Sequence, residues 1–151
     1  MKTEIRSISP SEVWPLRHEV MWPKESFDFV KLTNDESGIH YGLFIESDLV
    51  SVVSLFLTNN EGQFRKFATK ISEQGKGYGT ELLSHLFKQV EALDVQRIWC
   101  NARVDKASFY HRFGLKETAH SFIKNGQSYV VMEKTLKPSF QIPDILLFVK
   151  I

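Results

Sequence analysis

Cysteine is nearly absent from this sequence of 151 residues, in which Cys100 is the only one. A single cysteine excludes a disulfide framework and a cysteine-based zinc site, and it fits a reducing compartment, so we expect a cytoplasmic protein without a metal. The sequence also has no apolar run of the roughly 18 residues that cross a membrane, and its start lacks the apolar stretch of a signal peptide. We therefore predict neither a membrane span nor a signal peptide.

An excess of charge of one sign is missing as well. The 19 Lys and Arg residues nearly balance the 18 Asp and Glu residues, which leaves a formal net charge of +1. A dedicated nucleic-acid surface needs clustered and unbalanced Lys and Arg, so we expect no nucleic-acid partner. Aromatic residues make up 13% of the chain, which is typical of a folded core and not of a disordered chain.

The chain has the length of one domain and contains no repeat, low-complexity tract or interior linker. A compositional break follows the last strand-like run, so we expect one domain over residues 1–136 and a C-terminal extension over residues 137–151. The extension contains the apolar run ILLFV, which is too apolar to remain in water. We predict a strand or extended arm used in a homodimer; the alternative is a cap over the chain's own core.

Hydrophobic periodicity predicts a mixed α/β fold. The expected strands cover residues 3–8, 39–46, 49–57, 63–71, 97–102, 115–124 and 128–136. One helix is expected to begin at Ser9, where Ser9 and Glu12 have the spacing of a capping box, and others to cover residues 78–93 and 107–112. A further short helix is expected near residues 26–32, and the dipeptides Ser47-Asp48 and Asn125-Gly126 are expected to form hairpin turns.

A glycine-rich segment, QGKGYG at residues 74–79, separates a predicted strand from the amphipathic segment 78–93. Glycines let the backbone approach a ligand closely, and the free N–H groups at a helix start attract anions such as pyrophosphate. The same glycines could also serve only as a tight turn. The spacing matches neither the phosphate loop of nucleotide triphosphatases nor the dinucleotide-binding motif.

The spacing Gln74-x-x-Gly77-x-Gly79 resembles the Gln/Arg-x-x-Gly-x-Gly/Ala motif with which the GNAT superfamily of N-acetyltransferases holds the pyrophosphate of acetyl-CoA. The likeness extends to the segments RKFAT, IWCNAR and FYHRFGL, at residues 65–69, 98–103 and 109–115. With Leu16-Arg17 and the His-x-Gly at residues 40–42, the chain is most similar to a group of small bacterial members without an assigned acceptor.

The resemblance covers roughly residues 1–136. It implies a mixed, mostly antiparallel sheet, splayed between the fourth and fifth strands and flanked by helices. It also implies an N-acetyltransferase that moves an acetyl group from acetyl-CoA to a primary amine, on a small molecule or a peptide, by direct attack. In that reading Tyr110 protonates the departing thiolate; without the resemblance, Tyr110 would be read as a packed aromatic. Coenzyme binding is implied for Phe67, Ala68, Thr69, Gln74, Gly75, Lys76, Gly77, Tyr78, Gly79 and Thr80.

Two positions depart from the motif of many relatives. Gln63 stands where a glutamate base is often found, and an amide cannot take a proton, so water, His40, Glu46 or His120 would have to serve. Arg103 stands where an asparagine often contacts the pantetheine. Arg103 could reach a coenzyme phosphate or pair with Asp105, and Asn101 is an alternative coenzyme contact.

Two other kinds of protein remain open. The absence of a glutamate at Gln63 keeps an acyl-CoA-binding sensor or an inactive relative as an alternative. A nucleotide-binding structural protein is the third reading. Segments 20–38 and 118–130 are expected to shape the acceptor pocket, and the sequence does not identify the acceptor.

Overall fold

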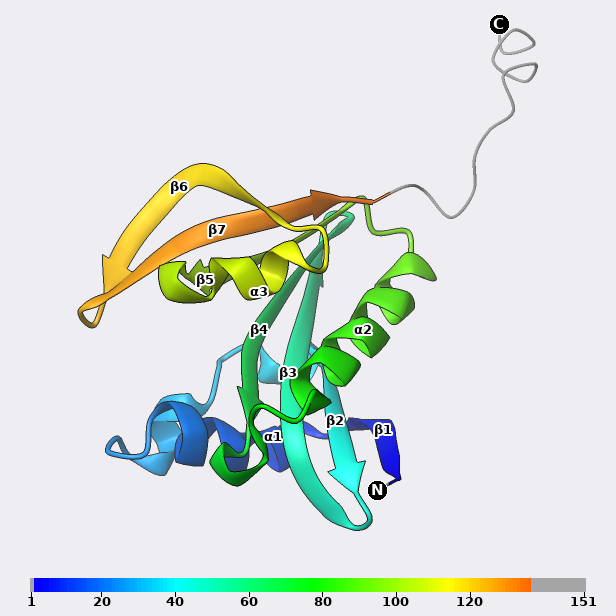
Figure 1. The fold of residues 1–151 in the computed structure, drawn as a ribbon, viewed down its shortest axis with the longest axis vertical. Helices are drawn as coiled ribbons and strands as arrows, with labels where there is room; N and C mark the ends of the chain where they lie inside the picture. Colours follow the sequence, from blue (N-terminus) through cyan, green and yellow to red (C-terminus); the bar gives the residue numbers. More distant parts are fainter. Residues whose placement is uncertain (1, 137–151) are drawn as a thin grey trace, which may run out of the picture.

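A computed structural model describes residues 2–136, and its centre is one seven-stranded sheet (Figure 1). The strand order is β1-β2-β3-β4-β5-β7-β6, and all neighbours are antiparallel except the parallel pair β4–β5. This confirms the predicted mixed, mostly antiparallel sheet. The strands are β1 (Thr3–Ile8), β2 (Ile39–Ile45), β3 (Asp48–Thr58), β4 (Glu61–Thr69), β5 (Arg97–Arg103), β6 (Lys116–Lys124) and β7 (Gln127–Thr135).

Helices cover both faces of this sheet. The α-helices are α1 (Pro10–Leu16), α2 (Tyr78–Glu91) and α3 (Ala107–His111). The shorter turns are η1 (Arg17–Met21), η2 (Phe27–Val30), η3 (Asp35–Ser37), η4 (Ile71–Glu73) and η5 (Val104–Lys106). The short helix predicted near residues 26–32 is confirmed as η2, whereas η3 was not expected. No helix within residues 2–136 is long and apolar enough to cross a membrane.

The helix α2 anchors the core on one face. Its side chains Leu82, Leu83, Leu86, Phe87 and Val90 are buried, as the helical spacing predicts. Burying each such side chain stabilises the fold by roughly 1.5–3 kcal/mol. The opposite face is covered by α1. One residue of β3 packs in the core cluster that contains α1, and the next residue along β3 packs in the cluster that contains α2. Successive strand residues point to opposite faces, so α1 and α2 lie on opposite sides of the sheet.

The sheet is splayed between its fourth and fifth strands, as expected. Only Glu61–Gln63 of β4 pair with β5, and the two strands diverge beyond Gln63. A register shift also interrupts the pairing of β3 with β4 between Val52 and Ser54, and Lys66 there has a φ of 56°. These features leave the β5-facing edge of residues 64–69 without a neighbouring strand, and a cleft lies beside that edge.

One predicted turn is wrong by one residue. Residues 46 and 47 form the connection between β2 and β3, not Ser47-Asp48, and Asp48 already belongs to β3. Glu46 adopts a left-handed φ of 57°, a conformation that a sequence reading assigns more readily to asparagine or glycine. The Asn125-Gly126 turn is confirmed, with φ values of 51° and 74°. The predictions for residues 137–151 lie outside the described residues.

Candidate active site

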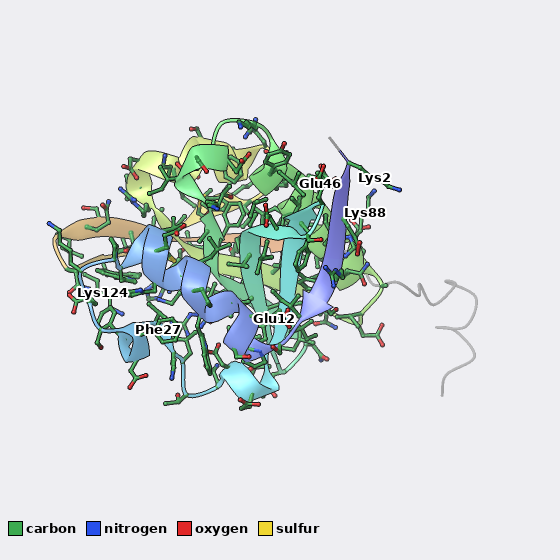
Figure 2. All side chains as sticks on the ribbon, turned by 90° about the horizontal axis from the view of Figure 1, so that it is seen from below. Lys2, Glu12, Phe27, Glu46, Lys88 and Lys124 are labelled. Atoms are coloured by element: carbon green, nitrogen blue, oxygen red, sulfur yellow. The ribbon has the colours of Figure 1, made fainter. Side chains whose placement is uncertain are left out.

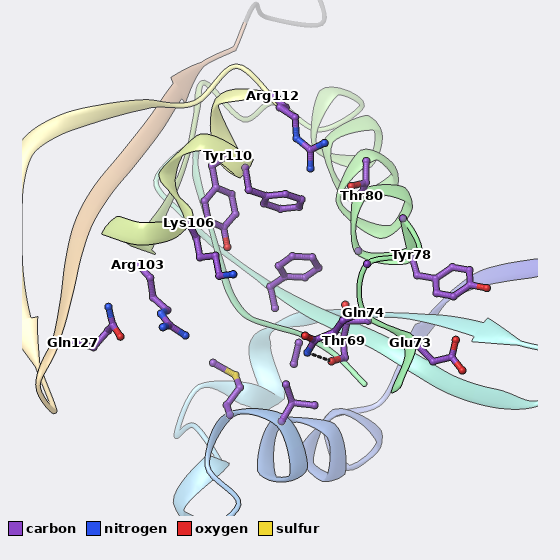
Figure 3. Close-up of a pocket in the computed structure, with 18 of the residues that line it drawn as sticks. Thr69, Glu73, Gln74, Tyr78, Thr80, Arg103, Lys106, Tyr110, Arg112 and Gln127 are labelled. Carbon is purple, nitrogen blue, oxygen red and sulfur yellow. Dashed lines mark hydrogen bonds between the residues drawn. The ribbon is translucent and has the colours of Figure 1, made fainter. Parts of the chain in front are cut away.

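A cleft of about 870 Å³ lies where β4 and β5 diverge (Figure 3). Its walls come from three parts of the chain that are distant in sequence: η1, the β4–α2 connection, and α3 with the β6–β7 hairpin. The lining residues are Val20, Met21, Trp22, Phe67, Ala68, Thr69, Glu73, Gln74, Gly75, Gly77, Tyr78, Gly79, Thr80, Arg103, Lys106, Phe109, Tyr110, Arg112, Asn125, Gln127 and Tyr129. The structure thus brings together every predicted site residue except Lys76 and Asn101.

The glycine loop requires its glycines at particular positions. Gly75 and Gly77 have φ values of 78° and 89°, which L side chains rarely adopt. At Gly79 a Cβ atom would lie 2.7 Å from Cζ of Phe67, so this glycine lets the start of α2 approach β4. The Gln74 amide donates a hydrogen bond of 2.9 Å to the Thr69 carbonyl and fixes the loop to the end of β4.

The start of α2 offers donors to an anion. The first backbone hydrogen bond at the start of α2 is donated by the Glu81 N–H to the Gly77 carbonyl, at 3.0 Å. The N–H groups of the residues between them have no partner one turn earlier in the helix. A 14-residue helix also adds the positive end of its dipole. Lys76 does not line the cleft, and its ammonium lies 3.1 Å from the Glu73 carboxylate.

The floor of the cleft is the unpaired end of β4. Ala68 is buried, and the Ser51 hydroxyl lies 2.8 Å from Oγ1 of Thr69, which holds this end of β4 against β3. The Phe67 ring stacks on the Phe109 ring of α3, with centroids 6.0 Å apart. The backbone of Phe67–Thr69 therefore forms a rigid strand edge that an extended ligand could pair with, as an added strand does.

Tyr110 lies on α3 and packs between Phe64 and Phe109, with ring centroids 5.8 and 5.2 Å away. Burial, followed by the nearby Cys100, raises the pKa of the Tyr110 phenol, and Arg103 offsets part of that rise. The phenol therefore keeps its proton at physiological pH, so it can serve as a proton donor but not as a general base. Burial also raises the pKa of Cys100 to about 12, so its thiol is not a nucleophile near neutral pH.

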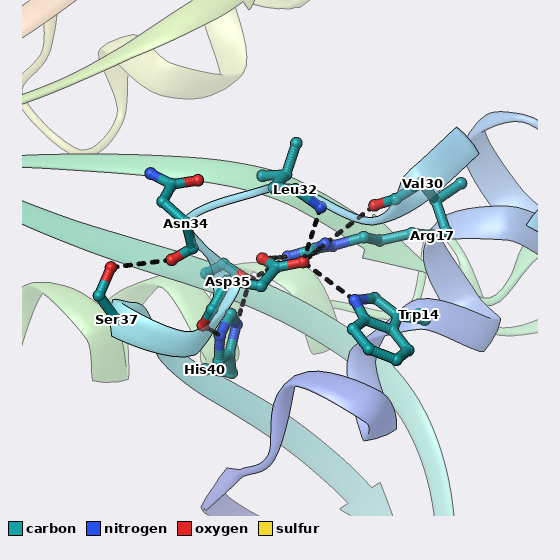
Figure 4. A network of polar contacts seen from close by, with 9 residues as sticks. Trp14, Arg17, Val30, Leu32, Asn34, Asp35, Ser37 and His40 are labelled. Atoms are coloured by element: carbon teal, nitrogen blue, oxygen red, sulfur yellow. Dashed lines mark hydrogen bonds and ion pairs between the residues drawn. The ribbon is translucent and has the colours of Figure 1, made fainter. Parts of the chain in front are cut away.

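None of the proposed general bases lines the cleft. His40 is buried, with Nδ1 2.6 Å from the Ser54 hydroxyl and Nε2 2.8 Å from the Asp35 carbonyl (Figure 4). Glu46 lies on the opposite side of the molecule from Lys124 and the hairpin tip (Figure 2). His120 is exposed on β6. Glu73 is the one carboxylate among the described residues that line the cleft.

A buried polar network positions one wall of the cleft (Figure 4). Arg17, at the start of η1, is fully buried and donates two hydrogen bonds to the Asp35 carboxylate, at 2.8 and 2.9 Å. It also donates to the Val30 carbonyl and to the Ser54 hydroxyl. Burial alone would raise the pKa of Asp35, but hydrogen bonds from Arg17, Leu32 and Trp14 lower it to about 2. The network fixes η1 to β3 and to the segment before β2.

Sequence reasoning located some of the remaining lining residues and missed others. The expected acceptor segments 20–38 and 118–130 do contribute to the cleft, through η1 and the β6–β7 hairpin. Glu73, Lys106, Phe109 and Arg112 were not singled out. Their nearness to the predicted loop and to Tyr110 is the signal that could have found them. Asn101 is exposed on β5 and does not line the cleft.

A strand edge opened by a splayed sheet, beside a glycine-rich helix start, defines the class of acyl-coenzyme-binding transferases that the sequence resembles. The chain matches the model of the acetyltransferase (GNAT) domain over residues 19–136, and it belongs to this family. It is 29% identical over 146 residues to the uncharacterized N-acetyltransferase YitI of Bacillus subtilis, covering 90% of this chain and 98% of that protein.

Solved structures show the same fold. The ribosomal-protein-S18-alanine N-acetyltransferase of Escherichia coli aligns with a TM-score of 0.77 and 15% identity, covering 95% of this chain and 98% of that one. A Bacillus subtilis acetyltransferase in complex with CoA aligns with a TM-score of 0.71 and 19% identity, covering 90% of this chain and 100% of that one. At these identities the likeness concerns the fold alone.

Proposed function

We propose that this protein transfers an acetyl group from acetyl-CoA to a primary amine by direct attack of the amine on the thioester. The observation that carries the proposal is one cleft that joins the start of α2, an unpaired strand edge and the partly buried Tyr110 phenol. Family membership supports the transferase class, and the CoA complex of a structural neighbour supports a coenzyme of this type. A cytoplasmic location and a homodimer stay predictions.

Each part of the cleft has a task in this reaction. Gln74–Thr80 hold the pyrophosphate through backbone N–H groups, and the Phe67–Thr69 edge pairs with the pantetheine arm. N–H groups of that edge stabilise the negative charge that develops on the thioester oxygen. The amine nitrogen forms a bond to the carbonyl carbon and loses a proton to water, while the carbon–sulfur bond breaks. Tyr110 gives its phenolic proton to the departing sulfur and recovers one from solvent.

The test of this mechanism is the variant Tyr110→Phe. Its kcat for thiol release from acetyl-CoA, with any amine that the wild type accepts, should fall about 100-fold or more. The dissociation constant for acetyl-CoA should change less than about threefold, since the ring and its packing are kept. Tyr41→Phe is the control, because Tyr41 is a tyrosine of the same core cluster that does not line the cleft. Unchanged kcat in Tyr110→Phe would refute the acid role.

A second candidate is an acyl-CoA-binding sensor that performs no transfer. It is favoured by Gln63 and by the absence, among the described cleft residues, of a histidine or of any carboxylate besides Glu73. The same assay separates the two. A wild type that binds acetyl-CoA but releases no thiol with any amine of a broad panel would be a sensor, not an enzyme.

A further inference from the structure

The cleft has two ends that differ in chemistry. Thr80 and Tyr78, at the start of α2, lie on one side of Tyr110, and Arg103 and Gln127 lie on the other side (Figure 3). The first end holds the donors that suit pyrophosphate. We term the second end, together with the cleft-lining residues of the η1 region and of the β6–β7 hairpin, the acceptor end; it comprises Met21, Trp22, Arg103, Asn125, Gln127 and Tyr129. Arg103 and Tyr129 are direct neighbours in the β5–β7 pairing.

The residues that line the acceptor end are rich in hydrogen-bond donors and include no Asp or Glu. Arg103 supplies a guanidinium, and Asn125 and Gln127 supply amides. The carboxylate that lines the cleft, Glu73, belongs to the other end and pairs with Lys76. A polyamine, whose ammonium groups need carboxylates, would find none among the lining residues of this end, and the nearby Asp105 carboxylate already faces Arg103.

Arg103 is available to a ligand. Its Nη2 lies 3.3 Å from the Asp105 carboxylate, and the two side chains are 50% and 59% exposed. An exposed ion pair of this kind contributes about 0–1 kcal/mol, so a ligand anion can replace Asp105 without a large loss. The planar guanidinium matches a carboxylate or a phosphate with two parallel hydrogen bonds.

Two further cations adjoin lining residues of the cleft in the sequence. Lys66 directly precedes Phe67 of the cleft floor, and Lys124 directly precedes Asn125. Burial, together with Arg65, Arg17 and Lys124, lowers the pKa of Lys66 to about 8. Within residues 2–136, neither Lys66 nor Lys124 forms a hydrogen bond or an ion pair. The nearby Asp35 carboxylate is already occupied by both Arg17 amino groups.

Trp22 also carries an unpaired polar group. It lines the acceptor end, and its indole N–H is buried without a hydrogen-bond partner among the described residues. An unsatisfied buried donor costs about 1–3 kcal/mol. A ligand oxygen that reached this N–H would recover part of that free energy.

We propose that the acceptor is a small amine that also carries an acidic oxygen group, a carboxylate or a phosphate, which Arg103 binds at the acceptor end. This proposal rests on the proposed function, because it assigns the second substrate of the same cleft. The amine is held toward the thioester by its own acidic group, so the charged end of the substrate and its nucleophile have separate binding sites. Polyamines and other amines without an acidic group lack the feature that this end recognises.

The experiment compares pairs of amines that differ only in the acidic group. Acetylation of lysine is compared with that of cadaverine, other amino acids with their decarboxylated amines, and phosphoethanolamine with ethanolamine. The acidic member of at least one pair should have a kcat/KM about tenfold or more above its partner. A preference confined to amino acids identifies the group as a carboxylate, and one confined to phosphoethanolamine identifies a phosphate. The proposal is overturned if spermidine or the amines without an acidic group are acetylated faster than the acidic amines, or if no acidic amine is turned over.

The variant Arg103→Gln tests the residue itself. It should raise KM for the acidic amine about tenfold or more and reduce the preference for this amine over the matched amine that lacks the acidic group. Arg6→Gln is the control, since Arg6 is an exposed arginine on β1, outside the cleft. Calorimetry with CoA separates the two proposals. If CoA binds and acidic amines are not preferred, only the acceptor class fails; if CoA does not bind, the proposed function fails.

Discussion

Asp35 illustrates how single residues far from the reaction can shape the cleft. Its carboxylate receives hydrogen bonds from Arg17, Trp14 and the Leu32 backbone, and its side chain is 2% exposed. Removing one partner of a buried ion pair destabilises a protein by about 3–5 kcal/mol, because the other charge remains buried. The Arg17–Asp35 pair therefore fixes η1, and through it Met21 and Trp22, at the acceptor end.

The pH dependence of stability follows from the same carboxylate. Its pKa is about 2 in the folded protein, below the ordinary value of 3.8, so its contribution is present above about pH 4 and is lost as the pH falls toward 2. Between pH 4 and pH 2, the free energy of unfolding measured with urea should fall by about 2 kcal/mol more in the wild type than in Asp35→Asn. Asp28→Asn, which removes a carboxylate from an exposed pair with Lys31, should follow the wild type. Equal losses in the wild type and Asp35→Asn would contradict this assignment.

Among single residues, those needed for a particular backbone conformation were easier to predict from the sequence than those whose role depends on partners far away in the chain. Gly77 and Gly79 were expected at a helix start because their spacing is local information. Arg17 was visible only as part of a short motif. Its complete burial depends on Asp35 and Ser54, which lie 18 and 37 residues away, and no local pattern reveals that.

The element that most directly shapes the cleft is α2. Its first turn lies against β4 only because Gly79 has no side chain, and Phe67, the residue that a Cβ would meet, stacks on Phe109. The approach of α2, the aromatic stack and the cleft floor are therefore coupled.

Gly79→Ala should displace the Phe67 ring and weaken CoA binding about tenfold, since overpacking costs about 1–3 kcal/mol. Titration calorimetry measures the dissociation constant, and thermal unfolding shows whether the fold is kept. Ser84→Ala in the same helix is the control, because it adds no atoms and does not line the cleft. Wild-type affinity in Gly79→Ala would show that the contact with β4 is not needed.

Hydrophobic periodicity predicted which segments form helices and strands. The errors concern where these elements end, which depends on contacts between distant segments. All the expected strands within residues 2–136 are present, with ends shifted by a few residues. The β2–β3 turn was misplaced because its first residue, Glu46, adopts a left-handed φ, and the pairing of these strands also contains a register shift between Leu43 and Phe44. Likewise, the helix expected to begin at Ser9 changes after Leu16 into the wider turn η1, where Arg17 enters its buried network.

At the scale of the whole molecule, the site exists because the sheet is opened. Three segments meet in the cleft: η1, the β4–α2 connection, and the β5–α3 region with the β6–β7 hairpin (Figures 1 and 3). The end of the cleft beside α2, where we propose that the coenzyme binds, could be located from the sequence because it is a contiguous strand, loop and helix. The acceptor end combines η1 with the hairpin, so the sequence indicated its segments and not its chemistry.

The central claim is that this cleft binds acetyl-CoA through the start of α2. The most direct measurement is calorimetric titration with acetyl-CoA, CoA and ADP of the wild type and of Gly77→Glu, which places a carboxylate at the helix start. Gly126→Glu is the matched control, because Gly126 also has a left-handed φ and open space around it. We predict that wild type and control bind acetyl-CoA and CoA, and that Gly77→Glu binds them at least about 100-fold more weakly. Equal affinities in all three proteins, or no binding by a folded wild type, would contradict the claim.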